Sequence, residues 1–83
     1  MSKKQKLIDK LKTRSRNFTY DEAETLLISL GFVKSNKGKT SGSKVAFDKG
    51  SSRIEIHRPH PRKELLKYQI ANLLSDLTGG GFI

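Results

Sequence analysis

The sequence predicts a two-layer α+β domain in which two helices cover one face of a three-stranded antiparallel sheet. Apolar stripes at helical spacing lie on either side of a segment that alternates apolar and polar residues around a glycine-bearing turn. The predicted order is therefore helix, strand, strand, strand, helix. A length of 83 residues allows one domain, and 34% hydrophobic residues suffice for a modest core. The chain has no cysteine, which excludes disulfides and thiolate metal sites.

The first sixteen residues form a basic extension. They carry seven Lys and Arg residues against the single acid Asp9, and so hold +6 of the net charge of +9. Leu7, Ile8 and Leu11 make a narrow apolar stripe, but like charges three and four residues apart weaken a helix. Both a short helix and a disordered basic arm stay open. We expect residues 1–16 to be an extension of a domain that spans 17–83.

The first helix of the domain begins after Thr19. Thr19 and Glu22 have the spacing of a capping box, in which hydroxyl and carboxylate each satisfy a free backbone amide. The apolar stripe that follows is made of Ala23, Leu26, Leu27 and Leu30. Gly31 supplies the left-handed residue that ends many helices.

The middle of the chain predicts three strands. A short strand begins at Phe32 and Val33, and a polar loop spans 36–42. Two alternating runs then flank the turn at 48–51, with Val45 and Phe47 on one face of the first run and Ile54 and Ile56 on one face of the second. Such a pattern is typical of a β-hairpin.

Burial of those four residues on one face allows only pairings that differ by two residues. If Asp48 lies opposite Arg53, then Lys44 lies opposite His57. If Asp48 lies opposite Ser51, then Lys44 faces Glu55 instead. In both registers Lys44, Glu55 and His57 form a cluster on the polar face of the sheet.

The last helix follows a proline-rich segment. Pro59 and Pro61 bracket His60 and end the third strand. The helix is predicted from apolar residues at helical spacing, namely Leu66, Ile70, Leu73, Leu74 and Leu77. Gly79–Gly81 end it, and Phe82 and Ile83 form a short tail.

The segment from residue 18 to 77 resembles the HicA family of small bacterial toxins. The matching residues are Leu30-Gly31-Phe32 after the first helix, Gly42-Ser43 at the start of the second strand, Phe47, and Glu64-Leu65 before the last helix. The resemblance implies a double-stranded-RNA-binding-like (dsRBD-like) fold, cleavage of messenger RNA, and a HicB-like antitoxin as partner.

One residue departs from the family pattern. The residue after Gly-Ser is usually a histidine, regarded as the catalytic group, and here it is Lys44. Three interpretations stay open: His57 has taken over the role of the base, Lys44 itself acts in catalysis, or the protein binds RNA without cutting it.

Metal-free RNA cleavage needs proton transfer and a cation near the phosphate. Histidine suits proton transfer, whereas lysine suits charge stabilisation. We therefore assign His57 to proton transfer, with His60 as second choice, Lys44 to the phosphate, and Glu55 to orienting either partner. His57 and His60 do not predict a metal site, because Pro59 prevents helical presentation and no cysteine or nearby aspartate completes a ligand set. No metal and no small-molecule cofactor is expected.

The basic residues of the domain predict RNA binding through phosphates and 2′-hydroxyls. The candidates are Lys37, Lys39, Ser43, Lys49, Arg53, Arg58, Arg62 and Lys63. Only six aromatic residues occur, and Phe32 and Phe47 fit the core, so a base-stacking platform of the type that binds single strands is not expected. Nonspecific DNA binding is a rival interpretation. The sequence shows neither a signal peptide nor an apolar run near the roughly 18 residues of a membrane span, so we expect a cytoplasmic protein.

Overall fold

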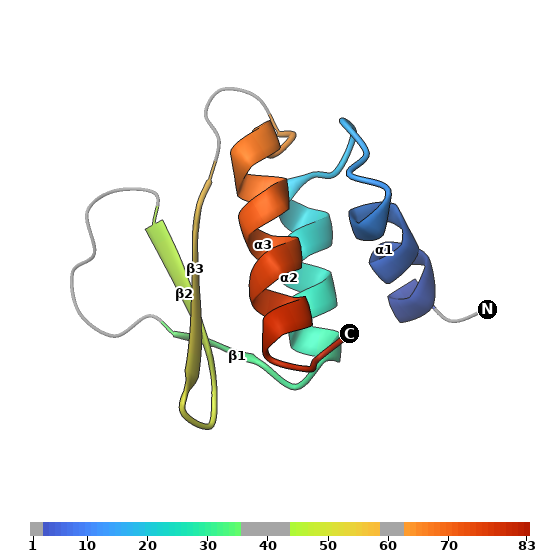
Figure 1. Cartoon of the computed structure of the whole chain (residues 1–83). Coiled ribbons are helices and arrows are strands. Elements are labelled where there is room, and N and C mark those ends of the chain that lie inside the picture. Colours follow the sequence, from blue (N-terminus) through green and yellow to red (C-terminus); the bar gives the residue numbers. More distant parts are fainter. Residues whose placement is uncertain (1–2, 36–43, 59–62) are drawn as a thin grey trace.

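The fold was analysed in a computed structural model that describes residues 3–35, 44–58 and 63–83. The predicted fold class is confirmed: an antiparallel three-stranded sheet packs against helices, in the order expected of a dsRBD-like domain, with one more helix in front (Figure 1). The elements are α1 (Lys3–Lys12), α2 (Tyr20–Ser29), β1 (Val33–Ser35), β2 (Lys44–Lys49), β3 (Ser52–His57) and α3 (Lys67–Gly79).

The sheet has the strand order β1-β2-β3, so that β1 and β3 are its edges. Helices α2 and α3 lie together on one side of it (Figure 1). The apolar face of the hairpin is buried as the alternation predicts, with Val45, Phe47, Ile54 and Ile56 in the core. The largest fully buried side chains are Phe18, Phe47, Leu11, Leu26, Leu27 and Leu77. One hydrophobic core therefore joins the sheet to all three helices.

The hairpin turn fixes the register of β2 and β3. Lys49 pairs with Ser52, which leaves Gly50 and Ser51 as a two-residue turn. Gly50 has a φ of +58°, whereas Ser51 has a negative φ. A positive φ at the first central residue alone is the type II′ geometry, which glycine adopts without strain and which matches the twist of the strands. The turn thus selects the pairing of Asp48 with Arg53.

The capping box that begins α2 is present. The Glu22 amide donates to the Thr19 hydroxyl at 3.1 Å, and the Thr19 amide donates to the Glu22 carboxylate at 3.0 Å. After the helix ends, Gly31 has a φ of +98°, which lets the chain turn back into the sheet. Phe32 is buried just before β1 begins.

The extension is helical and packs against the domain. Leu7, Ile8 and Leu11 of α1 are buried in the common core, on the side of α2 that faces away from the sheet (Figure 1). The Lys10 ammonium donates to both Glu22 carboxylate oxygens, at 2.9 and 2.8 Å. Burial would raise the pKa of Glu22, but the Lys10 and Thr19 donors outweigh it and lower that pKa.

The start of α3 differs from the prediction in one respect. Leu66 was expected on the apolar face, yet it precedes the helix and is 39% exposed, while Leu65 is 3% exposed. The reason is a contact distant in sequence: the Leu65 amide donates to the Phe18 carbonyl at 2.8 Å, and this bond turns Leu65 inward. At the other end of α3, Phe82 packs edge-on against Phe32, with ring centroids 4.9 Å apart.

Candidate functional site

The site begins with the cross-strand pair of Lys44 and His57. Of the two registers that the sequence allowed, the structure has the one in which these residues are directly opposite. The His57 carbonyl accepts a hydrogen bond from Gln69 Nε2 at 2.9 Å, so it faces α3 rather than β2. Lys44 and His57 therefore form a non-hydrogen-bonded pair, the type in which opposite side chains lie closer together.

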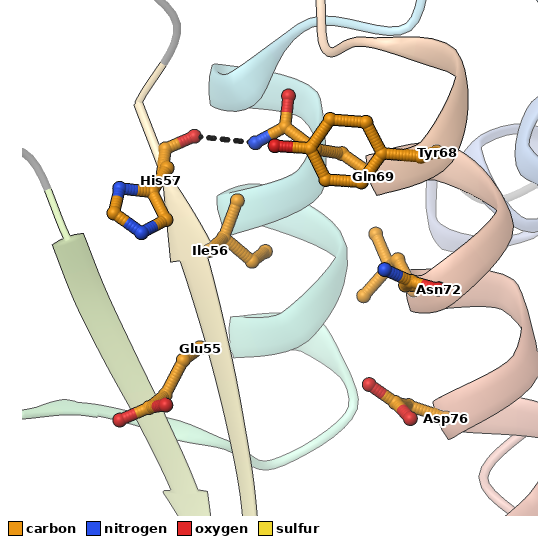
Figure 2. Close-up of a pocket in the computed structure, with 8 residues that line it drawn as sticks. Glu55, Ile56, His57, Tyr68, Gln69, Asn72 and Asp76 are labelled. Atoms are coloured by element: carbon orange, nitrogen blue, oxygen red, sulfur yellow. Dashed lines mark hydrogen bonds between the residues drawn. The ribbon is translucent and has the colours of Figure 1, made fainter.

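Glu55 completes the cluster. It lies diagonally across from Lys44, and its carboxylate is 3.1 Å from the Lys44 ammonium. The two side chains are 41% and 35% exposed, so water and salt screen this ion pair and its contribution to stability is small. The pair does more to orient the lysine than to stabilise the fold. Figure 2 shows Glu55 and His57 projecting from β3 on the side away from α3.

Gln69 anchors the end of β3 to the start of α3. Its amide nitrogen donates to the His57 carbonyl, and its amide oxygen accepts from the Leu66 backbone amide at 2.8 Å (Figure 2). The side chain thereby holds the backbone of His57 at a fixed place relative to the helix. Gln69 could not be predicted from the sequence, because nothing local distinguishes a glutamine that bonds to a residue twelve positions earlier.

Arg58, the residue after His57, is held by a chain of contacts across three elements. Its guanidinium lies 5.3 Å from the centre of the Tyr20 ring. The Tyr20 hydroxyl donates to Glu24 at 3.0 Å, and Lys34 Nζ lies 3.2 Å from the same carboxylate. Arg58 and Lys34 are therefore both held against the first turns of α2, by Tyr20 and Glu24.

The pKa values in this chain of contacts reflect the same arrangement. Burial raises the pKa of Tyr20, against the opposing effect of Arg58. Burial would also raise the pKa of Glu24, but Lys34 and the Tyr20 hydroxyl outweigh it and lower that pKa. Glu24 thus stays ionised and keeps both cations in place. Tyr20 and Glu24 were not predicted as site residues, although their spacing of four on one helix brings them into contact.

The other predicted residues do not all join this cluster. Arg53 pairs with Asp48 at 2.8 Å, and Lys49 donates to the Leu30 carbonyl at 2.6 Å, nearer the turn of the hairpin. Lys63 accepts a hydrogen bond from the Tyr20 amide through its carbonyl, with an exposed side chain. Predicted residues outside the described part of the chain are Lys37, Lys39, Ser43, His60 and Arg62.

Two further findings concern the described residues only. No three His, Asp or Glu residues in the ranges 3–35, 44–58 and 63–83 are grouped as a metal site would require. Within the same ranges, no helix is both long and apolar enough to cross a lipid bilayer.

The fold and this cluster define a small dsRBD-like domain with cationic and titratable side chains at one end of a hairpin. A sequence model described as "HicA toxin of bacterial toxin-antitoxin" matches residues 20–78, which is most of the chain. The protein therefore belongs to the HicA family, the toxins of toxin–antitoxin systems, and such a toxin has a cognate antitoxin. No curated protein and no solved structure gave a significant match.

Proposed function

We propose that this HicA family member binds messenger RNA and cleaves it without a metal, and that a HicB-like antitoxin restrains it by covering the polar sheet face around Lys44 and His57. The observation that carries the proposal is the direct pairing of Lys44 with His57 on an exposed strand pair. A group suited to proton transfer and a cation suited to a phosphate thus lie within reach of one ribose phosphate.

In the proposed reaction His57 takes the proton of the ribose 2′-hydroxyl. The 2′-oxygen then bonds to the adjacent phosphorus, the bond to the 5′-oxygen breaks, and a cyclic phosphate remains. Lys44 stabilises the negative charge on the phosphate oxygens, and Glu55 holds the ammonium toward the reacting group. The leaving 5′-oxygen gains a proton, for which His60 is the candidate donor from the sequence.

Binding would also use Arg58 and Lys34, which both contact α2 on the helix-covered side of the sheet. Arg58 is held beside His57 by Tyr20, and Lys34 by Glu24, which lowers the entropy lost when these side chains meet a phosphate. Lys63, whose side chain is exposed, is a further candidate for phosphate binding. The basic residues at 37, 39 and 62, which the sequence indicates, are candidates as well. RNA recognition of this kind reads backbone shape more than base sequence.

The test compares purified wild type, His57→Ala and Lys44→Met on a labelled RNA. We expect His57→Ala to lose roughly 100-fold or more in cleavage rate, the usual scale for a lost general base. Lys12→Met, on the exposed surface of α1, removes the same charge as Lys44→Met and should cleave like wild type. Binding to 2′-O-methyl RNA, which cannot be cleaved, and to DNA of the same sequence is measured in parallel.

The outcomes separate the components of the proposal. Full activity of His57→Ala would remove His57 from the mechanism while leaving the nuclease intact. Binding of 2′-O-methyl RNA with no cleavage by wild type would favour a non-catalytic RNA-binding module, which the presence of Lys44 at the family's histidine position also favours. Equal affinity for DNA would contradict the RNA-binding function. Inducible expression with and without an adjacent HicB-like gene tests the antitoxin.

A further inference from the structure

A small groove lies between the free edge of β3 and helix α3, directly beside His57 (Figure 2). We call it the β3–α3 groove; its volume is about 180 Å³ and it is lined by Glu55, Ile56, His57, Tyr68, Gln69, Asn72, Leu73 and Asp76. Ile56 and Leu73 are almost fully buried and form its floor. The backbone of Glu55 and His57 borders the groove, while their side chains project to the other side of β3 (Figure 2), so a ligand in the groove would lie across the edge of β3 from the candidate catalytic cluster.

The charge of the groove is unlike that of the rest of the protein. The chain carries +9, yet none of the described residues that line the groove is a lysine or an arginine, and Asp76 directs a carboxylate into it from α3, whereas the Glu55 carboxylate points to Lys44 on the other side of β3 (Figure 2). Such a lining does not attract a phosphate. It accepts hydrogen bonds from neutral N–H donors, of which the amino groups of nucleobases are an example.

The walls of the groove offer both stacking and hydrogen bonding. Tyr68 is 60% exposed, and its ring extends from α3 toward β3 in Figure 2. Asn72 and Asp76 follow it at intervals of four on the same helix face. An exposed aromatic ring, an amide and a carboxylate form the set of side chains by which proteins hold one unpaired base.

The edge of β3 contributes backbone groups to the same groove. The His57 carbonyl faces α3, and alternate residues of a strand direct their backbone groups to the same edge, so the Glu55 amide and carbonyl face α3 as well. The His57 carbonyl already accepts a hydrogen bond from the Gln69 side chain. An added peptide strand would have to displace Gln69 to continue along the edge, whereas a single base fits beside Glu55 without doing so.

We infer that the β3–α3 groove is a nucleobase subsite, which receives one unpaired RNA base that carries an exocyclic amino group. Tyr68 stacks on the base, and Asp76 and Asn72 bond to its amino group and ring nitrogens. Uracil has no amino group and is the base that this site excludes. The inference rests on the proposed function, since it gives that RNA-binding site a preference for the base next to the bound phosphate.

The experiment measures binding of 2′-O-methyl oligouridine with one central base varied. Adenine is compared with purine, guanine with hypoxanthine, and cytosine with 2-pyrimidinone, so that the two bases of each comparison differ only by an amino group. We expect the amino-bearing base of at least one pair to bind about fivefold or more tightly. Asp76→Ala should abolish that gap, whereas Ser75→Ala on the same helix should retain it.

Tyr68 gives a second, independent readout. Tyr68→Ala should weaken binding of every base about tenfold, whereas Tyr68→Phe, which keeps the ring, should lose clearly less affinity than Tyr68→Ala. Equal binding of the two bases in every comparison, or a difference in affinity that Asp76→Ala leaves unchanged, would overturn the nucleobase subsite while leaving RNA binding intact. Loss of antitoxin binding alone in these variants would also overturn it, and would assign the groove to the protein partner. Absence of any RNA binding by wild type would instead refute the proposed function.

Discussion

At the scale of single residues, Lys44 separates this protein from the pattern that the family resemblance implies. The position lies directly opposite His57, so a histidine there would put two imidazoles on one strand pair. With Lys44 present, the pair joins an ammonium group to one imidazole. In the proposed reaction, the side chain at position 44 therefore decides whether the strand pair offers one imidazole or two.

We predict that Lys44→His increases RNA cleavage. A second group able to transfer protons would supply the acid for the leaving oxygen, with a gain of about tenfold or more. Lys44→Gln, whose side chain has no charge and no ionisable proton, gives the reference. Its cleavage rate should fall below that of wild type. Cleavage by Lys44→His no faster than by Lys44→Gln would mean that position 44 serves the phosphate charge alone.

The adjacency of Lys44, Glu55 and His57 could be bounded from the sequence because side chains alternate along a strand. Burial of Val45, Phe47, Ile54 and Ile56 leaves only two registers, and both keep this cluster on the polar face. The contact between Arg58 and Tyr20 could not be predicted in that way. It depends on how the end of β3 meets the start of α2, which no local periodicity encodes.

At the scale of elements, the helix α1 is attached to α2 by apolar packing and by one ion pair. Lys10 and Glu22 are each about one-third exposed, so the pair contributes about 1 kcal/mol or less to the free energy of unfolding. The ion pair mainly sets the orientation of α1, because it holds this helix against the first turn of α2, where the capping box is also formed.

We predict that Glu22→Gln reduces stability at neutral pH but not in acid. The folded pKa of Glu22 is lowered, so its ion pair stabilises the fold above the unfolded pKa of about 4.3 and is lost as pH falls through the lower folded value. Glutamine can still accept the Thr19 amide bond of the capping box. Urea unfolding of both proteins should give a difference near pH 7 that shrinks below about pH 4.

Lys10→Met supplies the control, since it removes the same pair from the other side. Its stability relative to wild type should follow the same pH dependence. A difference between wild type and Glu22→Gln that persists unchanged in acid would show that the substitution acts on the helix cap rather than on the ion pair.

Most element types could be read from the sequence, because capping residues, glycines and apolar spacing are local signals. The last helix shows where such signals stop. Leu65 and Leu66 are adjacent and equally apolar, and spacing favoured Leu66, yet the backbone bond from Leu65 to Phe18 decides which of them is buried. Local signals likewise leave the helicity of α1 open, because the helix is stabilised by the packing of Leu7, Ile8 and Leu11 in the core.

At the scale of the whole molecule, charge and packing divide the chain differently. Residues 1–16 hold two-thirds of the excess positive charge, and by charge alone they look like a separate arm. By packing, Leu11 of that segment is fully buried in the same core as Phe47 of the sheet. The basic surface of α1 is therefore presented by a rigid part of the fold.

We predict that Leu11→Ala lowers the free energy of unfolding by about 2 to 5 kcal/mol, the usual range for a leucine truncated in a core. Leu66→Ala removes the same atoms from a residue that is 39% exposed and should cost clearly less. Chemical denaturation of both variants measures the difference. Equal, small losses would mean that α1 contributes little to the core and that residues 17–83 are stable without it.

The glycine of the hairpin turn has a consequence well away from its own position. A type II′ turn needs a positive φ at its first residue, and Gly50 supplies it. With a glycine at position 49 and an ordinary residue at 50, the same geometry would start one residue earlier and slide β3 by two residues along β2. Every apolar side chain would keep its side of the sheet, while Lys44 would exchange His57 for Glu55 as its opposite neighbour. The position of one glycine in the turn thus decides which side chain of β3 lies opposite Lys44 on the polar face.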